Sequence, residues 1–153
     1  MTATEATSVA GLIGVSMIVA RLASGVLMDI VFAPWVGAGV MSLCAIGLLL
    51  LATGDPALAW CGAIAIGLSI GIEFDLIAYL TARYFGLSAF GRIYGLLYGL
   101  TALGVSGSSL AYGYWADVAG SYRPALLCAT GLLSITVILF LTLPRFRDGS
   151  PGR

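Results

Sequence analysis

Histidine and lysine are absent from this 153-residue sequence, and charged side chains of any kind are few. Without histidine, the chain lacks the commonest protein metal ligand and the usual base at neutral pH. Only 9% of the residues are charged, whereas soluble domains carry about 25%. Seven arginines balance seven acids, so the formal net charge is zero and an overall basic nucleic-acid binder is excluded. So few charges cannot cover a water-facing surface.

The sequence also lacks the patterns of a disulfide framework or of a catalytic centre. Cys44, Cys61 and Cys128 lie inside apolar runs, far apart in the sequence, as small buried hydrophobic residues do. No phosphate-binding Walker loop, dinucleotide-binding glycine pattern or Ser/His/Asp set occurs. A membrane-embedded enzyme is disfavoured because there is no histidine and no cluster of acids. We therefore expect no enzyme, no metal site and no cofactor.

Long apolar runs dominate instead, with 60% hydrophobic residues and a mean hydropathy of +1.06. Each run is near the roughly 20 residues that a membrane-spanning helix needs. Barrel strands would be about 10 residues long and alternate in polarity. We therefore predict an all-α polytopic membrane bundle, a single transmembrane domain with a short tail at 144–153. The five predicted spans are 9–28, 36–52, 57–80, 93–115 and 125–143, separated by Pro34, the Gly54–Pro56 turn, the polar stretch 81–92, the 117–123 loop and Pro144.

The placement of arginine predicts the orientation in the membrane. If the first span ends inside, the inner side carries five arginines and the outer side carries Arg123 alone. An excess of arginine marks cytoplasmic segments. We therefore expect a multi-pass protein of the cell inner (plasma) membrane, with an external N-terminus and a cytoplasmic C-terminus. The five inner arginines are Arg83, Arg92, Arg145, Arg147 and Arg153.

Small residues recur every four positions in two of the predicted spans. Such stripes line one helix face and let backbones approach closely. They predict tight helix packing, and the alternative is that these faces slide against each other during transport. The third span carries Ala59, Ala63, Gly67, Gly71 and Asp75, and the fourth carries Gly91, Gly95 and Gly99.

Three segments resemble the major facilitator superfamily of transporters. Segment 21–29 (RLASGVLMD) resembles the end of that fold's eighth helix, segment 71–86 (GIEFDLIAYLTARYFG) the end of the tenth helix, and segment 113–122 (GYWADVAGSY) the loop before the twelfth. The second segment is similar to bacterial carriers of the oxalate/formate and monocarboxylate branch. Two positions depart from the family: Met17 stands where eukaryotic monocarboxylate carriers have an aspartate, and no basic residue follows Asp29 directly.

The resemblance implies a function and a missing part. Complete carriers of this type have twelve helices in two halves, with the substrate between them. Five spans correspond to helices eight to twelve, so we expect a truncated carrier or a half. It would need an amino-terminal half or self-association. Its expected function is secondary, alternating-access transport of a small organic solute, for example a monocarboxylate anion. The alternative is a non-transporting membrane remnant or assembly partner.

Arg21 is the first candidate substrate-binding residue. It lies eight residues before Asp29, about 12 Å along a helix, inside the first span. Charges at such depth usually face a bundle interior or water, and a guanidinium binds carboxylates in bidentate fashion. The functional interpretation is a contact with an anionic substrate. The structural alternative is an arginine that extends to the inner membrane surface or pairs with Asp29.

Two acids and a tyrosine complete the candidate set. Glu73 and Asp75 are two residues apart and so face nearly opposite ways on a helix. Asp75 shares the small-residue stripe, and an inner-rim charge network with Arg83 or between helices is favoured for it. Glu73 is the candidate protonatable or cavity residue. Tyr98 would give a ligand a hydrogen bond from the fourth span, although such tyrosines often bond between helices.

Overall fold

The computed structural model describes residues 3–144, with side chains from residue 7, and shows five α-helices in that part of the chain. Each helix is long and apolar enough to cross a membrane. The prediction of an all-α, polytopic bundle of five spans is therefore confirmed, and no strand occurs among the described residues. The helices are α1 (Ala3–Ile30), α2 (Ala33–Ala52), α3 (Pro56–Phe85), α4 (Leu87–Ala119) and α5 (Arg123–Thr142).

The prediction of a polar loop at 81–92 is wrong, because most of this stretch is helical. Only Gly86 separates the two helices, and its φ of 75° and ψ of 167° turn the chain. The reason is length: the 30 residues of α3 extend about 45 Å, beyond the roughly 30 Å hydrocarbon core. Polar residues such as Arg83 can therefore stay helical outside the lipid. Pro34 also lies within the first turn of α2 rather than between helices, where proline is compatible with a helix.

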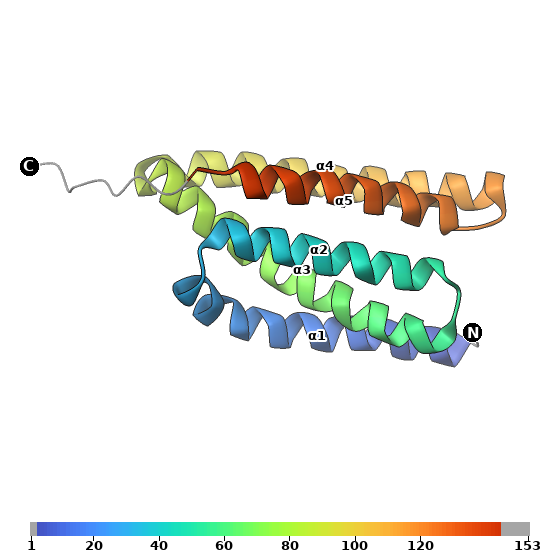
Figure 1. Ribbon diagram of the computed structural model, residues 1–153. Coiled ribbons are helices and arrows are strands. Elements are labelled where there is room, and N and C mark those ends of the chain that lie inside the picture. The colour runs from blue at the N-terminus through green and yellow to red at the C-terminus, as the bar shows by residue number, and fades with distance from the viewer. Residues whose placement is uncertain (1–2, 145–153) are drawn as a thin grey trace, which may run out of the picture.

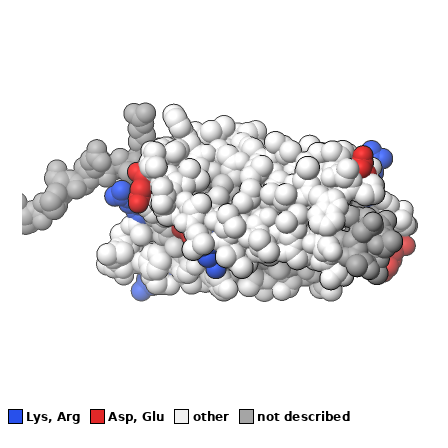
Figure 2. Space-filling model, turned by 90° about the horizontal axis from the view of Figure 1, so that it is seen from below, with Lys and Arg blue, Asp and Glu red and all other residues white. Residues whose placement is uncertain are grey.

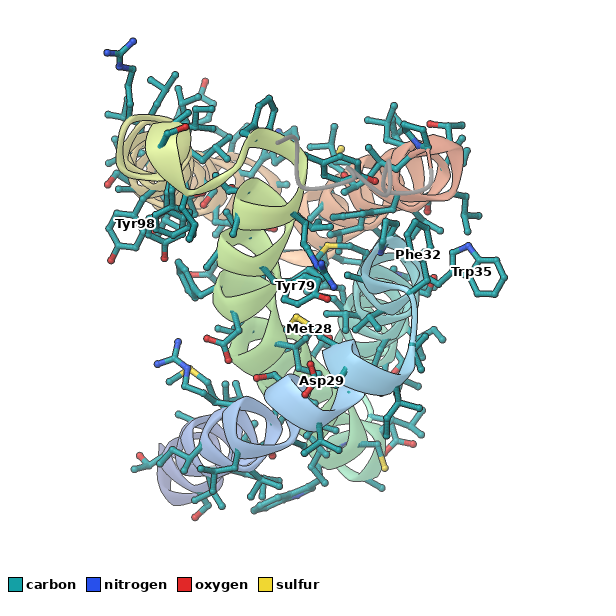
Figure 3. All side chains as sticks on the ribbon, turned by 90° about the vertical axis from the view of Figure 1, so that its left-hand side faces the viewer. Met28, Asp29, Phe32, Trp35, Tyr79 and Tyr98 are labelled. Atoms are coloured by element: carbon teal, nitrogen blue, oxygen red, sulfur yellow. The ribbon has the colours of Figure 1, made fainter. Side chains whose placement is uncertain are left out.

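Helices α2 and α3 lie in the middle of the molecule, with α1 on one side and the α4–α5 pair on the other (Figure 1). The main packing pairs are α1 with α3, α2 with α3, and α2 with α5. Viewed end-on, α3 stands between α1 and α4 (Figure 3). The space-filling view shows a mostly uncharged face, with most charged side chains near its ends and a few farther in (Figure 2). Such an apolar surface is what a membrane-spanning bundle requires.

The small-residue stripe of α3 packs closely on α1, as predicted. A Cβ atom built on Gly67 would lie 2.7 Å from the Cβ atom of Ser16, and one on Gly71 would lie 2.8 Å from that of Ala20. Real Cβ atoms do not come so close, so only glycine fits this contact. On the same stripe, Ala63 is fully buried.

The glycine stripe of α4 does not pack within this chain, contrary to the prediction. Cβ atoms built on Gly91, Gly95 and Gly99 would have no neighbour within 4 Å. No described residue of α4 is buried. The stripe therefore faces open space in the isolated chain, and α4 is held mainly by limited packing on α3 and α5.

Candidate functional site

The close approach of α1 and α3 joins Arg21 to Asp75. The Arg21 Nε atom lies 3.9 Å from the Asp75 Oδ1 atom. One turn after Arg21, the buried Ser24 hydroxyl lies 2.6 Å from Asp75 Oδ2 and 2.8 Å from the Arg21 carbonyl oxygen. Its single proton can be donated fully to only one of them, and the carboxylate is the stronger acceptor. Gly71, one turn before Asp75, makes this meeting of two helices possible.

Neither charge pair expected within a single helix forms. Asp75 pairs with Arg21 and Ser24 rather than with Arg83, and Arg21 does not pair with Asp29. Eight residues separate each expected pair, about 12 Å along a helix, which is too far for direct contact. Asp29 has no ion pair within the part of the chain that the structure describes. The Arg83 Nε atom instead donates to the Tyr79 hydroxyl at 3.3 Å, and its guanidinium lies over the Tyr79 ring.

Aromatic rings form a wall beside the Arg21–Asp75 pair. Phe90, Tyr94 and Tyr98 follow each other at four-residue spacing on α4, with ring centroids 5.2 Å and then 6.2 Å apart. Phe74 of α3 joins this row, its ring 5.9 Å from that of Tyr98. Side chains from α1, α3 and α4 thereby line an open cavity of about 300 Å³. It is lined by Arg21, Phe74, Asp75, Tyr94 and Tyr98.

The cavity unites two of the three predicted substrate-binding residues and leaves out the third. Arg21 and Tyr98 both line it, whereas Glu73 does not. Glu73 lies on another face of α3, on the side of the Cys44 thiol of α2. This separation follows from the roughly 200° between residues two apart on a helix.

A different region holds Asp29 and Met28, near the end of α1, together with Tyr79. Figure 3 shows Tyr79 on the side of α3 toward the end of α1, whereas Tyr98 projects from α4 on the other side. Met28 is buried in the core, and Tyr79 packs against that core. Tyr79 and Arg83 therefore lie at this end of the bundle and do not line the cavity.

Sequence reasoning missed Phe74 and assigned Asp75 to a gating or structural charge network rather than to the cavity. The spacing of Phe90, Tyr94 and Tyr98 was a usable signal, because residues four apart share a helix face. What the spacing could not show is that this face looks toward Arg21. That fact depends on the order in which α1, α3 and α4 pack.

Comparisons with known proteins identify no relative of this chain. No family model, no curated protein and no solved structure matches the chain. The site must therefore be interpreted from its own chemistry. The cavity contains a guanidinium, a carboxylate and three aromatic rings. Such groups can bind a small charged molecule. No group of side chains that could hold a metal ion occurs among the described residues.

Proposed function

We propose that this chain takes part in secondary, alternating-access transport of a small organic solute, as one part of a carrier of the major facilitator type. The observation that carries the proposal is the cavity where Arg21 meets Asp75 and the aromatic wall. It lies among helices that are long and apolar enough to cross a membrane. A solute carrier requires binding groups on membrane-spanning helices at the interface between its two halves.

The position of Arg21 supports binding more strongly than a purely structural role. Arg21 lies nine residues before the end of α1 at Ile30, about 13 Å along the helix. Its side chain is 51% exposed, although Asp75 stands beside it. A charge at the centre of a membrane costs about 2.5–3.5 kcal/mol. Facing water, a ligand or another protein avoids this cost, and an arginine that only extends to the membrane surface is the structural alternative.

The same exposure supports a second helical unit on this side of the bundle. The cavity lies between α1 and α4, and α4 has no buried residue in its described length. We place either a complementary amino-terminal half or a second copy of the chain against this side. It would cover Arg21 and close the cavity, so that rocking of the two units exposes the site to each side in turn.

The arginine distribution supports an orientation with the C-terminus in the cytoplasm of a cell whose inner membrane holds the protein. Arg83 lies in the last turn of α3 and Arg92 near the start of α4, which is the same end of the bundle. Arg123 begins α5 at the opposite end. The two ends of the described chain lie at opposite ends of the bundle (Figure 1). Arg145, Arg147 and Arg153 lie outside the described residues.

Uptake into proteoliposomes tests the proposal. The purified chain is reconstituted alone and with a co-expressed amino-terminal half encoded upstream. Labelled lactate, formate, oxalate and amino acids are offered as solutes. We expect saturable uptake only with the pair, because the chain alone leaves its cavity open. Arg21→Ala should abolish uptake without changing assembly, whereas Arg123→Ala, at the opposite end of the bundle, should preserve it.

Each other outcome has a defined meaning. Saturable uptake by the monomeric chain alone would refute the half-carrier interpretation. Unchanged uptake in Arg21→Ala would remove Arg21 from the substrate site. A stable pair that transports none of these solutes would favour a non-transporting assembly module.

A further inference from the structure

We infer that the cavity binds a zwitterion with an aromatic group, of the aromatic amino acid class, in preference to a simple monocarboxylate. This inference rests on the proposed transport function and names its substrate class. Three features of the cavity carry it: its charge balance, the looseness of its ion pair, and its aromatic wall.

The charge balance disfavours a lone carboxylate. Arg21 and Asp75 stand together at the cavity, so their charges cancel. A carboxylate that approaches Arg21 also approaches Asp75, which repels it, and its arrival leaves the site with net negative charge inside a bundle of membrane-spanning helices. A zwitterion adds no net charge. Its carboxylate lies on the guanidinium, its ammonium lies on the Asp75 carboxylate, and four alternating charges attract pairwise.

The ion pair leaves room for such a ligand. Its N–O separation of 3.9 Å is at the long end for a salt bridge and involves only Nε of Arg21. No other partner of the guanidinium occurs within the described chain, so both terminal nitrogens can bind a carboxylate in bidentate fashion. Ser24 is only 3% exposed and holds Asp75 through Oδ2 at 2.6 Å. The carboxylate is thus fixed in place, while Oδ1 still faces Arg21 and the cavity.

The aromatic wall determines which ligand side chain fits the cavity. Phe74, Tyr94 and Tyr98 line the cavity together with the charge pair. Their ring centroids lie about 6 Å apart in succession, a spacing at which aromatic rings attract each other edge to face or offset. A volume of about 300 Å³ is at the lower end for small-molecule sites. Formate or lactate would leave the rings without contact, whereas the ring of an amino acid such as phenylalanine would meet them.

Equilibrium binding to the full chain in lipid nanodiscs tests this assignment, since α1, α3 and α4 all belong to the chain. Labelled L-phenylalanine is competed by 3-phenylpropanoate, which lacks the ammonium, by 2-phenylethylamine, which lacks the carboxylate, and by L-alanine, which lacks the ring. We expect each analogue to compete at least about tenfold more weakly than L-phenylalanine, because each leaves one part of the site unpaired.

Single substitutions test which residue is responsible for each ligand preference. Asp75→Asn keeps an oxygen for the Ser24 hydroxyl but removes the negative charge, so 3-phenylpropanoate should gain affinity and L-phenylalanine should lose it. Tyr98→Leu should remove the preference over L-alanine. This substitution should leave the fold intact, since Tyr98 is 53% exposed on α4. Arg123→Gln, remote from the cavity, should change neither preference.

The outcomes separate this inference from the proposed function. If 3-phenylpropanoate binds as tightly as L-phenylalanine and Arg21→Gln weakens it, the zwitterion assignment is overturned and the anion-binding carrier stands. If none of the four compounds binds in a manner that depends on Arg21, the zwitterion assignment falls, whereas the proposed carrier falls only if the uptake test of the paired units also fails. A folded Asp75→Asn variant with an unchanged order of the four compounds also overturns the assignment, because the ammonium would then have no partner at Asp75.

Discussion

Two glycines with positive φ fix the turns at the two ends of α4. Gly86, before α4, has a φ of 75° and a ψ of 167°, a region open to almost no residue but glycine. Gly120, after α4, has a φ of 64° and a ψ of 12°, the left-handed helical region that asparagine also tolerates. Because α4 carries the aromatic wall, the Gly86 turn decides where Tyr94 and Tyr98 lie relative to Arg21.

Asparagine at these two positions should therefore give different results. Gly86→Asn should lower the free energy of unfolding by about 1–3 kcal/mol, the typical cost of a strained backbone residue. Gly120→Asn is the matched control and should cost less than about 1 kcal/mol. Reversible unfolding in mixed detergent and SDS micelles measures both. Equal losses of unfolding free energy in the two variants would contradict the backbone conformation described at Gly86.

Single residues also show how far the sequence determines the site. The depth of Arg21 in an apolar run and the polar group of Tyr98 were enough to predict their participation. Asp75 was predicted to join a charge network with Arg83 or between helices, but its partner Arg21 was not identified. Spacing along one helix cannot show which side chains stand on the helix opposite. Phe74 had no polar group to distinguish it from an ordinary apolar residue of a span.

At the scale of elements, the two glycine stripes have opposite surroundings. The α3 stripe meets α1, where atoms added to Gly67 or Gly71 would collide with the backbone carbonyl oxygens of Ile13 and Met17. The α4 stripe at Gly91, Gly95 and Gly99 meets nothing within 4 Å. The same sequence pattern therefore has a packing role on one helix, while on the other it faces the side where a second unit is proposed.

An alanine pair separates these roles. Gly71→Ala should destabilise the chain by about 1–3 kcal/mol, as overpacking of a tight contact does. Gly95→Ala should be neutral or stabilise it by up to about 1 kcal/mol, since alanine is the better helix former. Thermal unfolding of the purified variants in detergent compares them. A Gly95→Ala variant as unstable as Gly71→Ala would contradict the packing described for α1 and α3.

The helices themselves were largely predictable, and their ends were less so. Apolar runs near 20 residues gave all five spans because lipid imposes that length. The stretch 81–92 was predicted as a loop because it is polar, yet polarity marks only the edge of the hydrocarbon and does not end a helix. Gly86, with its backbone conformation, ends α3 there, and nothing in its neighbours distinguishes it from the helical glycines Gly91 and Gly95.

At the scale of the whole molecule, the cavity lies on the side of the bundle that the chain leaves open. Packing is extensive between α1 and α3, between α2 and α3, and between α2 and α5, while α4 is joined less extensively. The site therefore sits where a well-packed unit meets a less constrained helix. The central claim is that this place is a water-accessible solute site within the membrane rather than a lipid-facing surface.

Thiol labelling measures that claim most directly. With Cys44, Cys61 and Cys128 replaced by serine or alanine, single cysteines are placed at Tyr98, in the cavity wall, and at Ile135, which is exposed on α5 and lines no described part of the cavity. The chain is held in lipid nanodiscs and treated with a membrane-impermeant maleimide. Water in the cavity should make the cysteine at position 98 react rapidly, while lipid should protect the cysteine at position 135.

The account predicts fast labelling at position 98 that slows when 3-phenylpropanoate or L-phenylalanine is present, and slow labelling at position 135 that neither compound changes. Equal, slow labelling at both positions would contradict it, because the aromatic wall would then face lipid and could not line a solute site.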